Sequence, residues 1–553
     1  MYLAPGSNPT IVPADKRRRA RSVCQVVVIL AVAVVLCRGL TQDGVAWPDG
    51  AVHAMDGVLI HDWIAAGPSA WTAPLSFAQK QYARLPALGI GLHYPPAFAV
   101  AEAGVFGLVG VSSVGAKLTT VLFGILAGIG MYRLLLRSAR PTAACIGAAA
   151  LLSMPLIVEW GRQAMLEVPT IAAMLWASLL LVRYLEKPTW GRLAACTAVA
   201  ISMPLFKQPG VIMLPVVLLW MLVACIRRKM PVRHLLAAGA AVGLTVGPFF
   251  LAVLTKRGLV VELVSRDKPW HMWFAPDGWW WVLKTMAIGS GLVVTALAVL
   301  GLAVGAKRRG RVWWIATFWL AVGLAFCVFV QHREPRYLTV IVPPLALYVS
   351  LLAERVLAMI PRKRLRRALA AALLLAAVAL GWARPVPSTL NFYPVVAAHA
   401  EEMDRDIVLF CGNAEPAFIF AIRQYFGRHA PVVLRSSKIF YSCASDPRFH
   451  YKQFVHTSEE AGEVLEFYSP SIVVVEEELS AVVDVEGEHL IREHLAASTN
   501  YEYVGSYPVS EFERRPRRVK VYRRTAPSAR EVDELVLPVP IVNGKVRVKL
   551  SDL

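Results

Sequence analysis

The chain has 553 residues, of which 56% are hydrophobic and only 17% are charged, and its mean hydropathy is +0.52. This composition excludes an ordinary soluble protein, because the apolar residues are gathered into long runs of the kind that cross a membrane. The formal net charge of +20 would suit a nucleic-acid-binding protein. The basic residues, however, lie in short clusters between the apolar runs, as in the cytoplasmic loops of membrane proteins. We therefore expect membrane lipid as a partner and no nucleic acid.

The apolar runs predict a polytopic α-helical membrane domain with about eleven spans, each near the ~20 residues that a bilayer core requires. We expect these spans near residues 23–40, 114–136, 142–160, 168–184, 192–206, 209–226, 235–254, 286–305, 312–330, 337–357 and 368–383. Residues 1–22 would form a cytoplasmic N-terminal segment with no cleavable signal peptide. Residues 23–384 would form the membrane domain, with a large first extracytoplasmic loop at residues 41–113.

One further apolar stretch, residues 95–111, decides the orientation of everything after it. If this stretch does not cross, the short cytoplasmic loops together hold 24 Lys and Arg residues, whereas a crossing would place 19 of them outside. Because cytoplasmic loops collect Lys and Arg, we expect an interfacial helix there. Glu102 near its middle and the Pro95-Pro96 start favour the same interpretation. The N-terminus would then be cytoplasmic, in a plasma (inner) membrane protein whose C-terminal region lies outside.

Residues 385–553 are predicted to form a soluble, extracytoplasmic α/β domain. Residues 407–411 have the composition of a buried strand, residues 414–426 of a helix, and residues 472–475 of a second strand. Cys411 and Cys443 could form a disulfide in an extracytoplasmic domain. The other six cysteines lie in apolar runs, where we interpret them as small buried residues.

Charged and polar residues at the outer edge of the predicted spans are the best candidates for a functional site, because charges near the membrane are costly to keep. They come from several separate loops on one side, as an anionic substrate and a general base would require. They are Asp49, Asp56, Asp62, Arg162, Glu167, Lys207, Arg333, Arg336 and Tyr337.

Several of these candidates have simpler explanations. Asp62 is favoured to be a solvated loop charge, while Asp56, seven residues after Asp49, could share its helix face or be solvated. The basic candidates, Lys207 and the arginines at 333 and 336, could anchor the chain at the lipid headgroups. Two histidines in the first loop, His53 and His93, could bind a metal, but without cysteines or close spacing a hydrogen-bonding role is favoured.

Three segments together resemble the GT-C glycosyltransferases, the superfamily that includes protein O-mannosyltransferases and lipid A aminoarabinose transferases. The first is Trp47-Pro-Asp-Gly-Ala-Val-His53, where the family usually has an Asp-Glu pair, and here Gly50 replaces the Glu. The second is His93-Tyr94-Pro-Pro before the interfacial helix. The third is Arg162 followed by Glu167, where Asp is usual. The resemblance covers roughly residues 20–383.

This resemblance implies an inverting glycosyltransferase, moving a hexose or pentose from a polyprenyl-phosphate donor to a protein, lipid or glycan at the outer membrane face. Asp49 would deprotonate the acceptor, and Glu167 would be the second catalytic carboxylate. The residues implied in binding substrate or phosphate are His53, Asp56, His93, Tyr94, Arg162, Lys207, Arg333, Arg336 and Tyr337. A divalent metal is left open as a cofactor. The alternative is a flippase for lipid-linked sugars, although such transporters usually carry internal repeats and charges at the membrane midplane.

Overall fold

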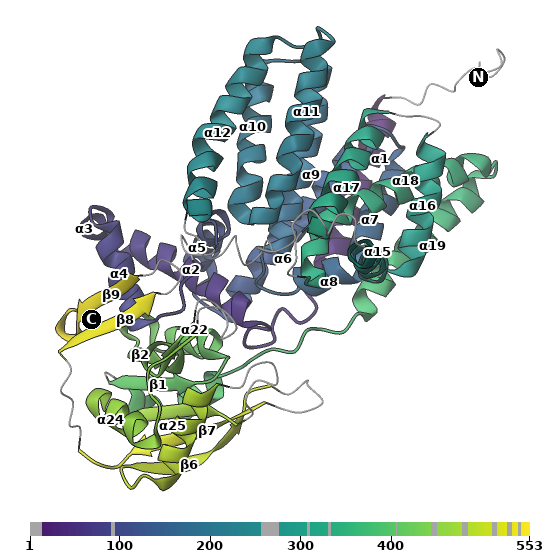
Figure 1. The fold of residues 1–553 in the computed structure, drawn as a ribbon. Helices are drawn as coiled ribbons and strands as arrows, with labels where there is room; N and C mark the ends of the chain where they lie inside the picture. Colours follow the sequence, from purple (N-terminus) through teal and green to yellow (C-terminus); the bar gives the residue numbers. More distant parts are fainter. Residues whose placement is uncertain are drawn as a thin grey trace, which may run out of the picture.

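The computed structural model describes residues 14–89, 94–255, 276–306, 310–329, 333–404, 406–443, 451–477, 485–510, 517–527, 533–539 and 544–553. Long helices form one end of the molecule, and a mixed sheet with its own helices forms the other, drawn in green to yellow in Figure 1. Of the residues expected in the site, His93 lies outside the described residues.

The helical part contains a helix or a helix pair at every one of the apolar runs. Its elements are α1 (Ala14–Leu36), α6 (Ser113–Leu135), α7 (Pro141–Ser153), α8 (Pro155–Gly161), α9 (Glu167–Glu186), α10 (Trp190–Phe206), η1 (Gln208–Ile212), α11 (Met213–Ile226), α12 (Val232–Thr255), α15 (Pro276–Ser290), α16 (Leu292–Ala306), α17 (Arg311–Phe329), η2 (Pro335–Ile341), α18 (Pro343–Met359) and α19 (Lys363–Ala383). Among the described residues, six helices are long and apolar enough to span a membrane, or up to nine spans if each bent pair is counted as one. A polytopic helical membrane protein is therefore confirmed, while the number eleven stays a prediction.

Three of the apolar runs are bent rather than straight. The bend is 69° between α7 and α8, 107° between α15 and α16, and 47° between η2 and α18. Pro155 and Pro343 begin the second helix of two of these pairs, where a proline without an N–H ends the preceding hydrogen-bond ladder. Gly291, with φ of +84°, makes the third break. The bends matter for the site because α8 and η2, two of the short halves, contact each other.

Residues 41–113, predicted to be a large first loop, fold into helices of their own, α2 (Pro48–Ala66), α3 (Pro68–Trp71), α4 (Pro74–Arg84) and α5 (Ala97–Val109). The last of these is the ambiguous apolar stretch. With 13 residues, α5 is about 20 Å long, which is too short for a hydrocarbon core of about 30 Å. This length agrees with the expected interfacial helix. It packs against α2, the helix whose first turn holds the predicted catalytic residue Asp49.

The C-terminal domain is built on a five-stranded sheet in the order β2-β1-β5-β7-β6. Strands β1 (Ile407–Cys411), β2 (Val432–Arg435) and β5 (Ile472–Glu476) are parallel, and β6 (Tyr501–Pro508) and β7 (Arg518–Arg524) complete the sheet antiparallel. Strand β1, which lies between β2 and β5, is buried along its whole length, as its unbroken apolar sequence predicts. Both strands predicted from the sequence, and the helix between them, are therefore present.

Helices and short elements surround this sheet. They are α20 (Tyr393–Ala398), α21 (Ala400–Met403), α22 (Glu415–Phe426), η3 (Gly427–His429), α23 (Ser436–Ile439), β3 (Tyr441–Ser442), β4 (Lys452–Gln453), α24 (Ser458–Tyr468), α25 (Glu486–Ala497), β8 (Glu534–Val539), β9 (Gly544–Lys549) and η5 (Leu550–Asp552). Cys411 and Cys443 are both buried free thiols, so the disulfide considered from the sequence is not formed in the structure.

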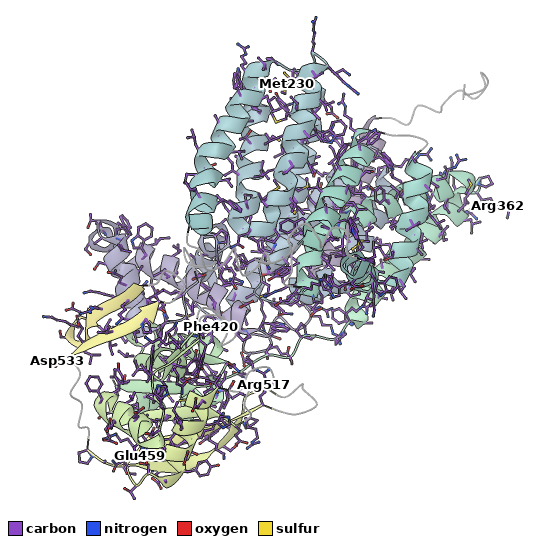
Figure 2. All side chains as sticks on the ribbon, viewed as in Figure 1. Met230, Arg362, Phe420, Glu459, Arg517 and Asp533 are labelled. Atoms are coloured by element: carbon purple, nitrogen blue, oxygen red, sulfur yellow. The ribbon has the colours of Figure 1, made fainter. Side chains whose placement is uncertain are left out.

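The C-terminal domain is joined to the first loop through α2 and α22, which pack together. Phe420, labelled in Figure 2, lies at this junction and belongs to an apolar core shared by both parts. At the end of α2, Asp62 accepts hydrogen bonds from Arg423 at 2.7 and 2.9 Å and from Arg428 at 3.3 Å. Asp62 is only 3% exposed, so the prediction that it is a solvated loop charge was wrong. A buried carboxylate needs such cationic partners, and here they belong to the other domain.

Candidate functional site

Asp49 lies in the first turn of α2. Trp47 precedes the helix with extended backbone, Pro48 occupies the first helical position, and Asp49 is the acidic residue of the first turn. A proline there sacrifices no hydrogen bond, and the helix dipole favours a negative charge at this end. Gly50 packs closely against the chain before α9. A Cβ atom added to Gly50 would lie 3.3 Å from the Ala164 carbonyl oxygen.

Asp49 forms an ion pair with Arg336, from the first turn of η2, and Arg336 in turn pairs with Glu334. Burial acts to raise the pKa of the Asp49 carboxyl, but the nearby positive charges outweigh it, and its pKa lies below its ordinary value. The Asp49 side chain keeps 33% of its surface exposed. It is therefore an ionised carboxylate that a solvent-borne group can reach.

The second carboxylate, Glu167, is the first residue of α9 and is fully buried. Its Oε1 pairs with the Lys207 ammonium, which extends from the residue that ends α10, where the helix dipole favours a cation. Its Oε2 has no hydrogen-bond partner within the described part of the chain. A buried carboxylate oxygen without a donor is costly, so the Glu167 side chain is incompletely satisfied as it stands.

Tyr337 connects the two ion pairs. The Lys207 Nζ lies 5.7 Å from the centre of its ring and the Arg336 Cζ lies 5.6 Å from it. Both distances are within the range of cation–π attraction. Two carboxylates and two cations, contributed by α2, α9, α10 and η2, thus form one cluster around a single aromatic ring.

His53 and Tyr94 adjoin this cluster on the α2 side. Their ring centres are 4.3 Å apart in an edge-to-face arrangement. Burial lowers the pKa of His53 to about 3, although the charge of Asp49 acts in the opposite direction, so the imidazole is neutral. In the part of the chain that the structure describes, no group of three or more His, Cys, Asp and Glu side chains is arranged to hold a metal ion. A neutral imidazole has one donor and one acceptor nitrogen, and the hydrogen-bonding role of His53 stays a prediction.

Arg162, expected to bind phosphate, has its guanidinium committed elsewhere. It is buried and donates to four backbone carbonyls, those of Val35 at 3.0 Å, Gly381 at 2.9 Å, Arg384 at 2.7 Å and Pro385 at 3.2 Å. These bonds join the end of α8 to the ends of α1 and α19. We assign Arg162 a structural role on this basis and leave it out of the proposed site.

Two further candidates contact residues outside the cluster. Asp56 is buried and accepts the backbone N–H of Gly89 at 2.7 Å, which fixes the chain after α4. Arg333 lies over the ring of Trp281 at 6.0 Å. Glu334, which pairs with Arg336, was missed in the sequence, although its place between two candidate arginines was a usable signal.

Comparisons with known proteins agree with this architecture. Residues 93–251 match the protein family described as dolichyl-phosphate-mannose-protein mannosyltransferase. Among solved structures, ArnT from Cupriavidus metallidurans in the apo state is similar with a TM-score of 0.58 at 16% identity, covering 91% of this chain and 98% of that one. The same protein bound to undecaprenyl phosphate gives a TM-score of 0.55 at 14% identity, covering 93% and 99%. A comparison with curated protein sequences gives no match.

The similarity to ArnT extends over nearly the whole of both chains, so it includes the C-terminal domain as well as the membrane helices. The chain therefore has the GT-C fold, and the resemblance read from its three sequence segments is confirmed.

Proposed function

We propose that this protein is an inverting glycosyltransferase that moves a hexose or pentose from a polyprenyl-phosphate donor to an acceptor hydroxyl. The observation that carries the proposal is the cluster around Tyr337, in which a reachable ionised carboxylate lies beside two cations. The two cations supply a place for a lipid phosphate, and the carboxylate supplies a base. The GT-C fold, and the undecaprenyl phosphate bound to the similar ArnT structure, support a lipid phosphate as the partner.

In the proposed reaction, Asp49 accepts the proton of the acceptor hydroxyl while its oxygen attacks the anomeric carbon of the donor sugar. The bond between that carbon and the phosphate oxygen breaks, and its electron pair leaves with the lipid phosphate. Attack opposite the leaving group inverts the anomeric centre. Lys207 and Arg336 stabilise the negative charge that grows on the phosphate, Arg336 with a planar guanidinium suited to two phosphate oxygens.

The ion pairs give this reaction an order of events. A donor phosphate that approaches Arg336 and Lys207 competes with Asp49 and Glu167 for the same cations. When the phosphate becomes the counter-ion of Arg336, the Asp49 carboxylate is released and its proton affinity rises. The base is thus made available when the donor is in place, which would limit wasteful chemistry on an empty site.

We place this site at the outer face of a plasma membrane, with the N-terminus inside and the C-terminal domain outside. The basic clusters support this orientation. Met230, next to Arg227, Arg228 and Lys229, and Arg362, at the start of the last cluster, are labelled in Figure 2 at ends of the helical part that lie away from the C-terminal domain. Because Lys and Arg collect in cytoplasmic loops, the domain belongs on the opposite side.

The alternative of a lipid-linked sugar flippase keeps one supporting observation. Three helix pairs are bent at breaks, and discontinuous helices are common in transporters. The two functions are separated by purifying the full-length protein, reconstituting it in liposomes and supplying polyprenyl-phosphate sugars labelled in a hexose or a pentose. Transfer of label to a water-soluble or lipid acceptor, with release of polyprenyl phosphate, is expected. Movement of intact donor across the bilayer without bond cleavage would contradict the proposal.

A further inference from the structure

An exposed tryptophan lies two residues before the proposed base Asp49. Trp47 leaves 47% of its surface exposed, although its ring packs against Trp160 with the centroids 5.9 Å apart and the planes at 44°. Trp160 is itself buried and belongs to α8, so the pair is anchored in the fold. One part of the Trp47 indole is therefore held in place, and another is open, two residues from Asp49.

Polar residues stand close to Trp160 in the sequence, although the Trp160 ring itself belongs to the apolar core. Glu159, next to Trp160, is exposed, and its carboxylate is close enough to Glu167 for the two charges to act on each other. The Gln163 amide donates to the Glu159 carbonyl at 3.0 Å, which leaves its own oxygen free to accept. The short chain from Glu159 to Glu167 thus carries two carboxylates, an amide and the Trp160 indole.

Three buried polar atoms in this chain are unsatisfied. The Trp160 Nε1, the Gln163 Oε1 and the Glu167 Oε2 have no hydrogen-bond partner among the described residues. Each such atom is costly to keep, because it has lost its hydrogen bond to water and gained none in the protein. Structures rarely keep three of them together without a use, and a ligand rich in hydroxyl groups, directly or through water, can satisfy both donors and acceptors.

A sugar ring has the matching chemistry. Its C–H face is apolar and packs on an indole, while its hydroxyls donate to carboxylates and amides and accept from an indole N–H. A tryptophan that only anchors the protein in the lipid interface has no need of carboxylates next to it. The first turn of α2, which holds Asp49, and the chain before Glu167 meet at Gly50 and Ala164, so a sugar stacked on Trp47 would lie next to the base.

We infer that the acceptor is a carbohydrate, and that Trp47, Trp160, Glu159 and Gln163 form its binding subsite. The inference rests on the proposed function and names the class of acceptor that it leaves open. The stacked sugar ring presents one hydroxyl to Asp49, and the remaining hydroxyls bind the carboxylate and amide groups. Trp47 acts here by binding and orientation, and takes no part in the proton transfer.

The acceptor class can be tested with the full-length protein in liposomes and a panel of labelled polyprenyl-phosphate hexoses and pentoses. Three acceptors are offered separately: a mixture of cell-envelope oligosaccharides, a Ser/Thr-rich peptide, and phospholipid alone. Label on the oligosaccharides is expected. Donor cleavage with the label on the peptide or phospholipid would overturn this inference and leave the proposed function standing. If no donor is cleaved with any acceptor, the proposed function falls and the inference falls with it.

Substitutions test the subsite itself. Trp47→Ala is expected to raise the KM for the oligosaccharide roughly tenfold and to leave the KM for the donor unchanged, with Trp47→Phe intermediate. Trp71→Ala, on α3, is the matched control, because Trp71 is equally exposed at 49%. Equal effects of Trp47→Ala and Trp71→Ala, or a Trp47→Ala effect on the donor KM instead, would contradict the assignment. Should Trp47→Ala unfold in a thermal melt, Glu159→Gln gives the same comparison at an exposed residue, and an unchanged acceptor KM there would count against the subsite.

Discussion

The two ends of α2 carry carboxylates of opposite character. Asp62, near its C-terminal end, is buried and receives hydrogen bonds from two arginines of the C-terminal domain. Asp49, in its first turn, keeps one third of its side chain exposed and pairs with Arg336, which is shared with Glu334. One helix of 19 residues therefore holds a closed, structural ion pair at one end and an open, exchangeable one at the other.

The difference teaches how to separate structural from functional charges in this fold. Breaking a buried, saturated pair leaves an uncompensated charge and costs about 3–5 kcal/mol, which favours keeping it shut. A partly exposed pair is held weakly, because water competes for both partners. A substrate phosphate can replace the carboxylate only in a partly exposed ion pair. Asp49 and its partners are therefore suited to a reaction, and Asp62 is suited to holding two domains together.

The largest effect is expected from Asp49→Asn, which removes the base and keeps the side-chain shape. Sugar transfer should fall by about 10²–10⁴-fold, the usual contribution of a general base. The protein should remain folded, because the amide can still hydrogen-bond to Arg336. The measurement is initial transfer rate in liposomes together with a thermal melt. Asp43→Asn, an exposed aspartate of the same loop, serves as the control and should keep its activity. Full activity in Asp49→Asn would remove it from the catalytic role.

The buried ion pair of Lys207 and Glu167 should affect both the stability of the fold and the rate of transfer. Lys207→Met leaves Glu167 as a buried charge without its cation and should destabilise the fold by about 3–5 kcal/mol. Adding Glu167→Gln removes that charge, so the double variant should regain most of the stability while transfer stays low, because the phosphate has lost a cation. Thermal melts and donor KM values of the two single variants and the double variant separate these effects. Recovery of activity together with stability in the double variant would show that the pair is only structural.

At the other end of α2, the Asp62→Asn substitution should affect stability and leave the chemistry intact. Losing the carboxylate leaves the Arg423 and Arg428 cations without a counter-charge, one of them buried, and about 3–5 kcal/mol of docking energy is at stake. We expect the C-terminal domain of this variant to be cleaved off sooner and to unfold at a lower temperature than in the unsubstituted protein. Limited proteolysis and a thermal melt measure the two changes. The transfer rate per folded molecule should match the unsubstituted protein at low temperature. A selective loss of turnover with unchanged stability would place Asp62 in the site and erase the contrast between the two ends.

The sequence predicted the fold in outline, because hydrophobic runs and buried strands are local patterns. The apolar runs fall on helices, and residues 407–411 and 472–475 fall on strands β1 and β5. The short apolar stretch at 95–111 was kept out of the spans by the distribution of charge, and its 13-residue helix agrees with that. The breaks at Pro155, Gly291 and Pro343 were missed, because an apolar run has the same composition whether it is straight or bent.

The candidate site was predicted less evenly. Asp49, Glu167, Lys207 and Arg336 come together as the sidedness of the loops suggested. Arg162 and Asp62 could not be sorted from them, because their partners are backbone carbonyls and arginines more than 120 residues away in the sequence. Residue type and topology locate a charge on one face of the membrane, but only the three-dimensional contacts show whether that charge is already fully paired.

A smaller effect is expected from Gly50→Ala, at the position where related proteins usually carry Glu. The added Cβ would meet the Ala164 carbonyl at 3.3 Å, so the first turn of α2 must shift by a few tenths of an ångström and carry Asp49 with it. A several-fold drop in turnover is expected, since catalytic groups tolerate little displacement. Gly104→Ala on α5 is the control, because no atom lies within 4 Å of its added Cβ. Equal activity in the two variants would mean that the Gly50 contact does not set the position of the base.

The smallest effect is expected in the pH profile of transfer, which should show no change in activity near the ordinary pKa of histidine. The pKa of His53 is about 3 and that of Asp49 lies below its ordinary value, so neither group changes charge between pH 5 and 8 in the free enzyme. As far as these two groups determine it, kcat/KM should be constant over that range. Activity should be lost only at lower pH, where Asp49 becomes protonated. Donor phosphate that takes Arg336 away from Asp49 raises the carboxyl pKa, so the acid limb of kcat should lie at higher pH than that of kcat/KM. A limb of kcat/KM near pH 6.5 that disappears in His53→Gln would assign the proton transfer to the histidine. If the acid limbs of kcat and kcat/KM coincide, Asp49 stays paired with Arg336 when the donor binds. The ion pair at the start of α2 would then be as permanent as the Asp62 pair that holds the two domains together.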